Sequence, residues 1–120
     1  MKSKYPNFKF MAESYWNDGD DLLGLGFDFV YDKDGLYDVI TTRNLDNIRS
    51  YIKNRGAKLN VGTHFIENHD EGRAATHFGN NTVANAAGLI TFTLPGMRFH
   101  FEGQWLGRKN QLDVHLRRSY

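Results

Sequence analysis

The sequence contains no cysteine, which excludes disulfide bonds and thiolate metal sites. Proline occurs only at positions 6 and 95, and no low-complexity linker divides the 120 residues. No apolar run approaches the roughly 18 residues of a membrane span, and the N-terminus has no hydrophobic signal-peptide region. These absences predict a single cytoplasmic domain over residues 1–120 whose stability comes from packing or association.

An excess of charge is also missing. The 15 Lys and Arg residues nearly balance the 14 Asp and Glu residues, and they are spread along the chain apart from a small C-terminal basic cluster. Such a balance creates no field that would attract nucleic acid or an anionic membrane surface. We therefore expect neither among the partners of this protein.

Aromatic residues, by contrast, are abundant: nine Phe, six Tyr and two Trp. Most of the Phe residues are expected in the core. Tyr and Trp combine an apolar ring with a polar group, so they also suit surfaces that stack on sugars.

The hydrophobic pattern alternates predicted strands with predicted helices. Runs rich in apolar and aromatic residues predict strands over 8–12, 26–31, 61–67 and 97–101. Helical spacing and capping residues predict helices over 20–25, around 36–40, over 45–55 after the N-cap Asn44, and over 83–94 before Pro95-Gly96. This alternation is typical of an α/β fold with a parallel sheet.

Polar residues follow two of the predicted strands at the points where they end. Glu13 and Tyr15 follow the first strand, and His69 and Asp70 follow the third. Because the carboxyl ends of parallel barrel strands open onto one mouth, we expect Glu13 and Asp70 to share a rim. The structural alternative is a pair of strands that end in ordinary polar turns.

Four segments in the same order resemble the alpha-amylase family of glycoside hydrolases. Phe-Ile-Glu-Asn-His-Asp-Glu at 65–71 resembles the end of barrel strand seven, and Ala-Glu-Ser-Tyr-Trp at 12–16 the end of strand five. The runs at 26–33 and 94–104 resemble strands six and eight, so the likeness extends from residue 8 to about residue 116. The resemblance implies half of a TIM-type (βα)8 barrel: four parallel strands with helices, corresponding to strands five to eight.

The resemblance also implies roles for individual residues. Glu13 and Asp70 take the catalytic positions, Glu13 as general acid/base and Asp70 as the residue that holds sugar hydroxyls. The implied substrate-binding residues are Asn68, His69, Tyr15 and Trp16, and the implied ligand is an α-glucan. No cofactor is implied.

One catalytic element of the family is missing. Retaining glycosidases use two carboxyl groups about 5–5.5 Å apart, and in this family the nucleophile is an Asp that ends strand four. No such segment is present, and 120 residues fall well short of the roughly 250 of a complete barrel. We therefore expect the single chain to be inactive.

A half-barrel leaves two unpaired sheet edges and an apolar concave face, which favour association. The simplest closed arrangement is a two-fold homodimer, in which the first strand of one copy pairs with the last strand of the other. In that arrangement the region of Glu102 would lie near the place of the absent nucleophile.

No metal site is predicted. Neighbouring residues of an extended segment point to opposite sides, which would separate His69 from Asp70, and no helix face carries paired histidines. Calcium is used by some amylase-like proteins, but the loops expected to bind it belong to the missing half.

Three functions therefore remain open. The first is a non-catalytic amylase-like protein that retains weak carbohydrate binding. The second is a hydrolase or transglycosylase on α-glucans, completed by a separate chain that supplies strands one to four and the nucleophile. The third is a structural or interaction module without sugar binding.

Overall fold

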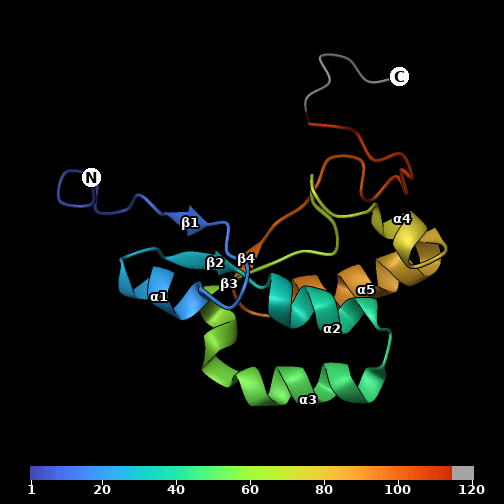
Figure 1. Ribbon diagram of the computed structural model, residues 1–120, viewed down its shortest axis with the longest axis horizontal. Coiled ribbons are helices and arrows are strands. Elements are labelled where there is room, and N and C mark those ends of the chain that lie inside the picture. The colour runs from blue at the N-terminus through green and yellow to red at the C-terminus, as the bar shows by residue number, and fades with distance from the viewer. Residues whose placement is uncertain (115–120) are drawn as a thin grey trace.

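The computed structural model describes residues 1–114 and shows an α/β fold around a four-stranded, all-parallel sheet (Figure 1). The strands are β1 (Met11–Ala12), β2 (Phe29–Tyr31), β3 (Gly62–His64) and β4 (Met97–Arg98), in the order β1-β2-β3-β4. The predicted α/β class and parallel pairing are confirmed. The last residues of the predicted domain, 115–120, lie outside the described part of the chain.

Helical segments connect the strands. They are α1 (Gly19–Gly24), the π-helical turn η1 (Lys33–Tyr37), α2 (Asp38–Thr41), α3 (Leu45–Arg55), the 3₁₀ helix η2 (Gly56–Val61), α4 (Ala74–His77) and α5 (Asn81–Thr93). Helix α3 begins as predicted, because the Asn44 side chain accepts hydrogen bonds from the N–H groups of Asp46 and Asn47. None of the helices within residues 1–114 is long and apolar enough to cross a membrane.

The paired strands are shorter than the predicted runs. Cα partners are Met11 with Phe29, Val30 with Gly62, and Thr63 with Met97. The predicted third strand extends to Glu67, but pairing ends at His64. Residues 65–68 remain buried beyond it, because they form the base of the polar loop that carries Asp70.

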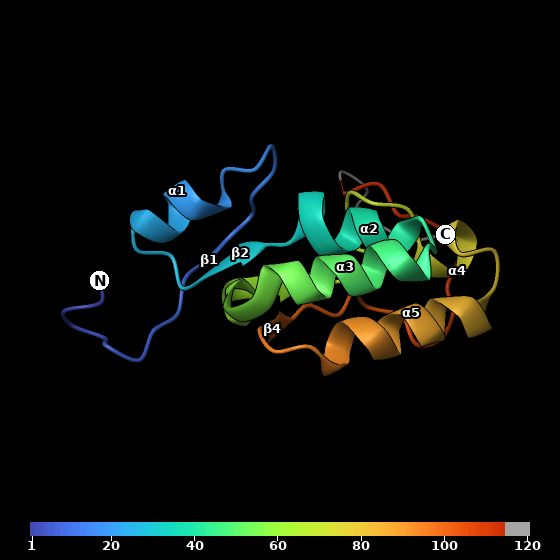
Figure 2. The same cartoon turned by 90° about the horizontal axis from the view of Figure 1, so that it is seen from below.

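Two apolar clusters fill the fold. The larger one lies among α2, α3, α4 and α5, which Figure 2 shows packed close together, and its buried members are Ile40, Ile48, Ile66, Ala74, Phe78, Ala84 and Ala87. The second cluster is aromatic and contains Tyr31, Tyr37 and Phe65, with Tyr15 and Phe99 packed against it. Each of the four strands or its exit segment therefore contributes at least one ring to the second cluster.

A buried polar network joins the strands below this aromatic cluster. Asp32 follows β2, and its carboxylate lies 3.3 Å from Nδ1 of His64 in β3, with both side chains at most 3 % exposed. The Tyr51 hydroxyl and the Leu36 N–H donate to the other carboxylate oxygen of Asp32. His64 Nε2 lies 2.8 Å from the Pro95 carbonyl, so both ring nitrogens face acceptors and the imidazolium form is favoured.

The pKa values of this pair move in opposite directions. Burial by itself would raise the pKa of Asp32, but hydrogen bonds from His64, Tyr51 and Leu36 outweigh it and lower that pKa. Burial by itself would lower the pKa of His64, but the Asp32 carboxylate and two backbone carbonyls raise it. The folded state therefore favours the charged form of both groups.

We expect the free energy of unfolding to be highest between the ordinary pKa values of the two groups, 3.8 and 6.5. The Asp32 contribution is present above its unfolded pKa and is lost as the pH falls through its folded pKa. The His64 contribution is present below its unfolded pKa and is lost as the pH rises through its folded pKa. Asp32→Asn should flatten this profile and destabilise the protein by about 3 kcal/mol, as expected for a broken buried pair.

Urea unfolding followed by circular dichroism across this pH range measures the effect. Asp46→Asn is the matched control, because the Asp46 side chain is 93 % exposed and pairs only with Arg49. A pH profile of Asp32→Asn that matched the wild-type profile would show that the pair does not control stability.

Candidate functional site

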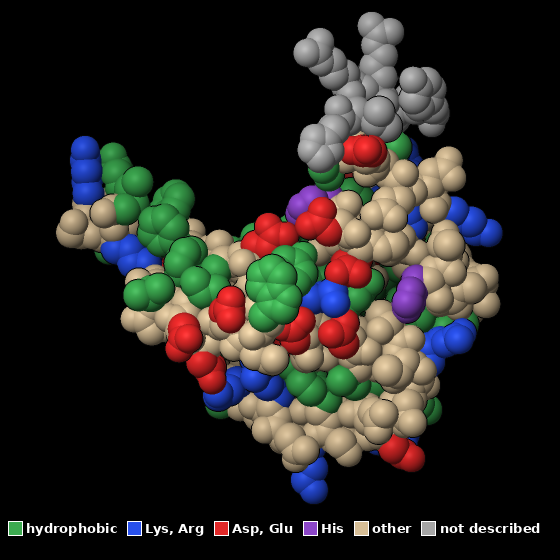
Figure 3. Space-filling view, in the orientation of Figure 1, with side chains coloured by type: hydrophobic (Ala, Val, Ile, Leu, Met, Phe, Trp, Pro, Cys, Tyr) green, Lys and Arg blue, Asp and Glu red, His purple; other side chains and the backbone are tan. Residues whose placement is uncertain are grey.

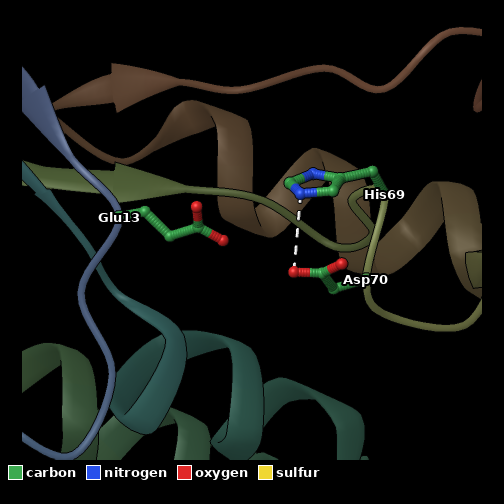
Figure 4. Close-up of side chains that lie close together, drawn as sticks. All are labelled: Glu13, His69 and Asp70. Atoms are coloured by element: carbon green, nitrogen blue, oxygen red, sulfur yellow. Dashed lines mark ion pairs between the residues drawn. The ribbon is translucent and has the colours of Figure 1, made fainter. Parts of the chain in front are cut away.

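Two separate loops bring Glu13, His69 and Asp70 together at the carboxyl ends of the strands (Figure 4). Glu13 follows β1, whereas His69 and Asp70 follow β3, and β2 lies between these two strands in the sheet. One side-chain nitrogen or oxygen from each residue lies within 4.8 Å of the others. The predicted convergence of Glu13 and Asp70 on one rim is therefore present in the structure, while their catalytic roles stay predictions.

Asn68 determines the shape of the loop that carries His69 and Asp70. Its side chain is fully buried, and its Oδ1 accepts hydrogen bonds from the N–H groups of Asp70 at 3.0 Å and Glu71 at 2.7 Å. The backbone is therefore turned rather than extended, and His69 Nε2 lies 3.4 Å from Asp70 Oδ2. The expectation that these two side chains point to opposite sides is wrong.

A buried ion pair between Glu67 and Arg73 stabilises the same loop. The Glu67 carboxylate lies 2.9 Å from the Arg73 guanidinium, and both side chains are at most 3 % exposed. Burial raises the pKa of Glu67, against the opposing effects of the Ala74 N–H and Arg73. Arg73 also donates to the Glu102 carbonyl at 2.9 Å, which ties this loop to the segment after β4.

Tyr15 positions the Glu13 carboxylate. Its hydroxyl donates to Glu13 Oε1 at 3.2 Å. Burial, together with the hydrogen bond to Glu13 and its charge, raises the pKa of Tyr15 to about 12, although the Asn68 side chain acts in the opposite direction. The hydroxyl therefore stays protonated near neutral pH and remains a donor.

Trp16 follows Tyr15 in the same loop and has an unusual backbone conformation. Its side chain is 83 % exposed, and Trp16 and Asn17 have φ angles of 56° and 64°, in the left-handed region that non-glycine residues rarely adopt. The Asp34 carboxylate accepts a hydrogen bond from the Asn17 N–H at 2.8 Å and holds this conformation. No sequence signal pointed to this role of Asp34, because Asn17 and Asp34 are 17 positions apart.

An open groove of ≈ 450 Å³ adjoins His69 and Asp70. Its other wall is formed by Gln111, Leu112, Asp113 and Val114. Gln111 donates to the Asp70 carbonyl at 3.1 Å and joins the two walls. Sequence reasoning missed this wall, because residues 111–114 carry no strand or helix pattern that would have placed them.

The two carboxylates of the site, Glu13 and Asp70, have no Lys or Arg partner among residues 1–114, and the only charged-type partner of Asp70 there is His69. Their field contributes to raising the pKa of Tyr31, after the larger effect of burial. Figure 3 shows acidic side chains gathered in the middle of this face of the molecule.

The structure places the six predicted site residues close to one another, but in different surroundings. Glu13, His69 and Asp70 form a group in which His69 is half-buried, and Asn68 is fully buried. Tyr15 contacts Glu13, and Trp16 packs against Tyr15 with ring centroids 5.8 Å apart. Glu102 does not join them within the chain, since its carboxylate is 75 % exposed and pairs with Arg108 at 3.2 Å.

Glu13, His69 and Asp70 offer hydrogen-bond acceptors and an imidazole, the rings of Tyr15 and Trp16 follow Glu13 in the same loop, and the open groove adjoins His69 and Asp70. The site can therefore receive a small polar ligand that has both hydroxyl groups and an apolar face. No protein-family model, curated protein or solved structure matches the chain.

Proposed function

We propose that this protein is a non-catalytic carbohydrate-binding protein, similar to the second half of an amylase-type barrel, and that it binds α-linked glucose units. The proposed ligand lies across Glu13, His69 and Asp70 and stacks on Trp16. The resemblance of residues 12–16 and 65–71 to the alpha-amylase family suggests the ligand class.

The observation that carries the proposal is the exposure of the Trp16 side chain on a strained backbone. Burying a Trp side chain is favourable, yet this one is 83 % exposed. Two consecutive left-handed residues cost of order 1–3 kcal/mol each. A strained backbone that presents an apolar ring to water, next to the Tyr15 that contacts Glu13, is what a stacking platform for a sugar ring requires.

The neighbouring groups supply complementary polar chemistry. The carboxylates of Glu13 and Asp70 accept hydrogen bonds from sugar hydroxyls, and such charge-assisted bonds are the stronger kind. His69 either donates or accepts at the same place. Recognition of a ring with hydroxyls at its edge and C–H groups on its face needs both elements.

The role is non-catalytic because the chain has no counterpart to the strand-four nucleophile. One observation favours hydrolysis as a second candidate function. Carboxylate oxygens of Glu13, the implied acid/base, and Asp70, the implied sugar-holding residue, lie within 4.8 Å of each other, so both could contact one sugar unit. A separate chain that supplied the missing strands would then complete an active site.

We expect maltotriose to produce a saturable change in Trp16 fluorescence in the millimolar range. Trp105→Phe leaves Trp16 as the single tryptophan reporter and serves as the background. In that background, Glu13→Gln or Asp70→Asn should weaken binding roughly tenfold to a hundredfold, because a charge-assisted hydrogen bond contributes about 1.5–3 kcal/mol.

The matched control is Asp46→Asn, which also removes one exposed carboxylate but lies on α3. No fluorescence response to millimolar maltotriose would contradict carbohydrate binding and favour an interaction module. Hydrolysis of an aryl α-glucoside by the single chain, abolished by Glu13→Gln, would instead contradict the non-catalytic role.

Asp34→Ala should weaken maltotriose binding by about twofold to tenfold. Trp16 would then lose its fixed orientation, and ordering such a side chain on binding costs about 0.5–1.5 kcal/mol. Asp18→Ala, in the same loop, is the control, because the Asp18 side chain forms no cap hydrogen bond with α1. Equal affinities of the Asp34→Ala and Asp18→Ala proteins would show that Asp34 does not position the ring.

We further propose that the sheet is half of a barrel and that a second copy of the chain completes it. Within residues 1–114, β1 pairs only with β2, and β4 pairs only with β3, so both borders of the sheet are open. The strands run in sequential order and in parallel, and a two-fold axis would join each β1 to the partner's β4.

The aromatic cluster supports this interpretation. In TIM barrels, side chains from the strands pack in layers inside the barrel. Tyr15, Tyr31, Phe65 and Phe99 pack together at the carboxyl ends of the four strands, with centroid separations of 4.9 to 6.3 Å, as the side chains of such a layer would. Two large apolar side chains also stay exposed at the β1 border, Met11 within the strand and Phe8 just before it.

Light scattering after size-exclusion chromatography should give twice the mass of the chain. Met11→Lys places a charge on the open border at β1 and should shift the protein towards the monomer. Leu45→Lys, which replaces an exposed leucine at the start of α3, should leave the mass unchanged. A wild-type protein that ran as a monodisperse monomer at all concentrations would exclude the closed dimer.

A further inference from the structure

We propose that Glu13, His69 and Asp70 bind one first-row divalent transition-metal cation. The inference does not require sugar binding, because it depends only on the positions and charges of these three side chains. Figure 4 shows the three side chains facing a common space from two loops.

The geometry fits metal ligands. Zinc binds imidazole nitrogen and carboxylate oxygen at about 2.0–2.2 Å, which separates neighbouring ligands by roughly 3–3.5 Å. His69 Nε2 and Asp70 Oδ2 already lie 3.4 Å apart, and an oxygen of Glu13 lies within 4.8 Å of one possible ligand atom on each of the other two residues. Glu13 is exposed, so a small change of its side-chain torsions closes the remaining distance.

The charge of the group provides an independent reason. Within the described chain, Asp28, Glu67, Glu71 and Glu102 each pair with Lys or Arg, whereas Glu13 and Asp70 do not. Two carboxylates held close together without a Lys or Arg neighbour repel each other, and a divalent cation between them would remove that repulsion.

Residues around the group restrict how the ligands can move. The Tyr15 hydroxyl donates to one Glu13 oxygen and leaves the other free. Asn68 fixes the turn that places His69 and Asp70 on the same side. Such supporting hydrogen bonds orient metal ligands before the ion arrives and are part of a binding site.

The ligand set also selects the type of cation. One imidazole and two carboxylates suit Zn²⁺, Fe²⁺ or Mn²⁺, whereas Ca²⁺ prefers six to eight oxygen ligands. Three protein ligands leave at least one coordination position for water or for a ligand in the adjoining groove. A cation here would occupy the same carboxylates as the proposed sugar, so the two ligands should compete.

Isothermal titration of the chelator-treated protein with ZnCl₂, without sugar, tests the proposal. We expect one ion per chain, weaker binding of Mn²⁺ and the weakest binding of Ca²⁺. His69→Ala and Glu13→Gln should each reduce zinc affinity at least about tenfold. His77→Ala, which removes an exposed histidine from α4, should bind zinc like the wild type.

Co²⁺ provides a second readout, because its visible absorption reports the ligands directly. The Co²⁺ spectrum should change in His69→Ala and not in His77→Ala, and circular dichroism checks that each variant is folded. Absence of zinc binding, or equal affinities of the His69→Ala and His77→Ala proteins, would overturn the proposal. Maltotriose binding is measured separately in the presence of EDTA, so either proposal can fail without the other.

Discussion

The candidate site depends on one buried hydrogen-bond acceptor, the side-chain oxygen of Asn68. By accepting from two successive N–H groups, at Asp70 and Glu71, it turns the backbone at the end of a buried segment. Without that turn, an extended chain would carry His69 and Asp70 to opposite sides, and Glu13 would face only one of them. The proposed chemistry therefore follows from a short local motif supported from below by the Glu67 and Arg73 pair.

Local sequence signals predicted the elements of the fold well. Asn44 begins α3, and the positive φ of Gly56 ends it, as expected for residues with these side chains. The strand lengths were overestimated, because hydrophobic runs report burial and not pairing. Phe65 and Ile66 are buried to 1 % exposure, yet both lie beyond the last paired residue of β3.

Interactions between distant segments were not predictable in the same way. The pairing of Asp32 with His64 joins two strands, and neither residue stood out as part of a network in a single sequence. The bond from Asn17 to Asp34 likewise connects loops after β1 and β2. The ends of the predicted parallel strands indicated a shared rim for Glu13 and Asp70, whereas only the likeness to a known family suggested what the two residues would do there.

The proposed closure of the sheet and the proposed ligand binding at the rim involve the same strand, β1. The rim is built from the exits of β1 and β3, and β1 is itself an open border of the sheet. A second copy joined at that border would bring the segment after its β4 towards Glu13. Since that segment begins with alternating polar and aromatic residues, association would change the charge and the shape of the surface near Glu13. Ligand binding and dimer formation would then be coupled: a ligand that contacts both copies would stabilise the dimer, and dimer formation would strengthen binding of that ligand.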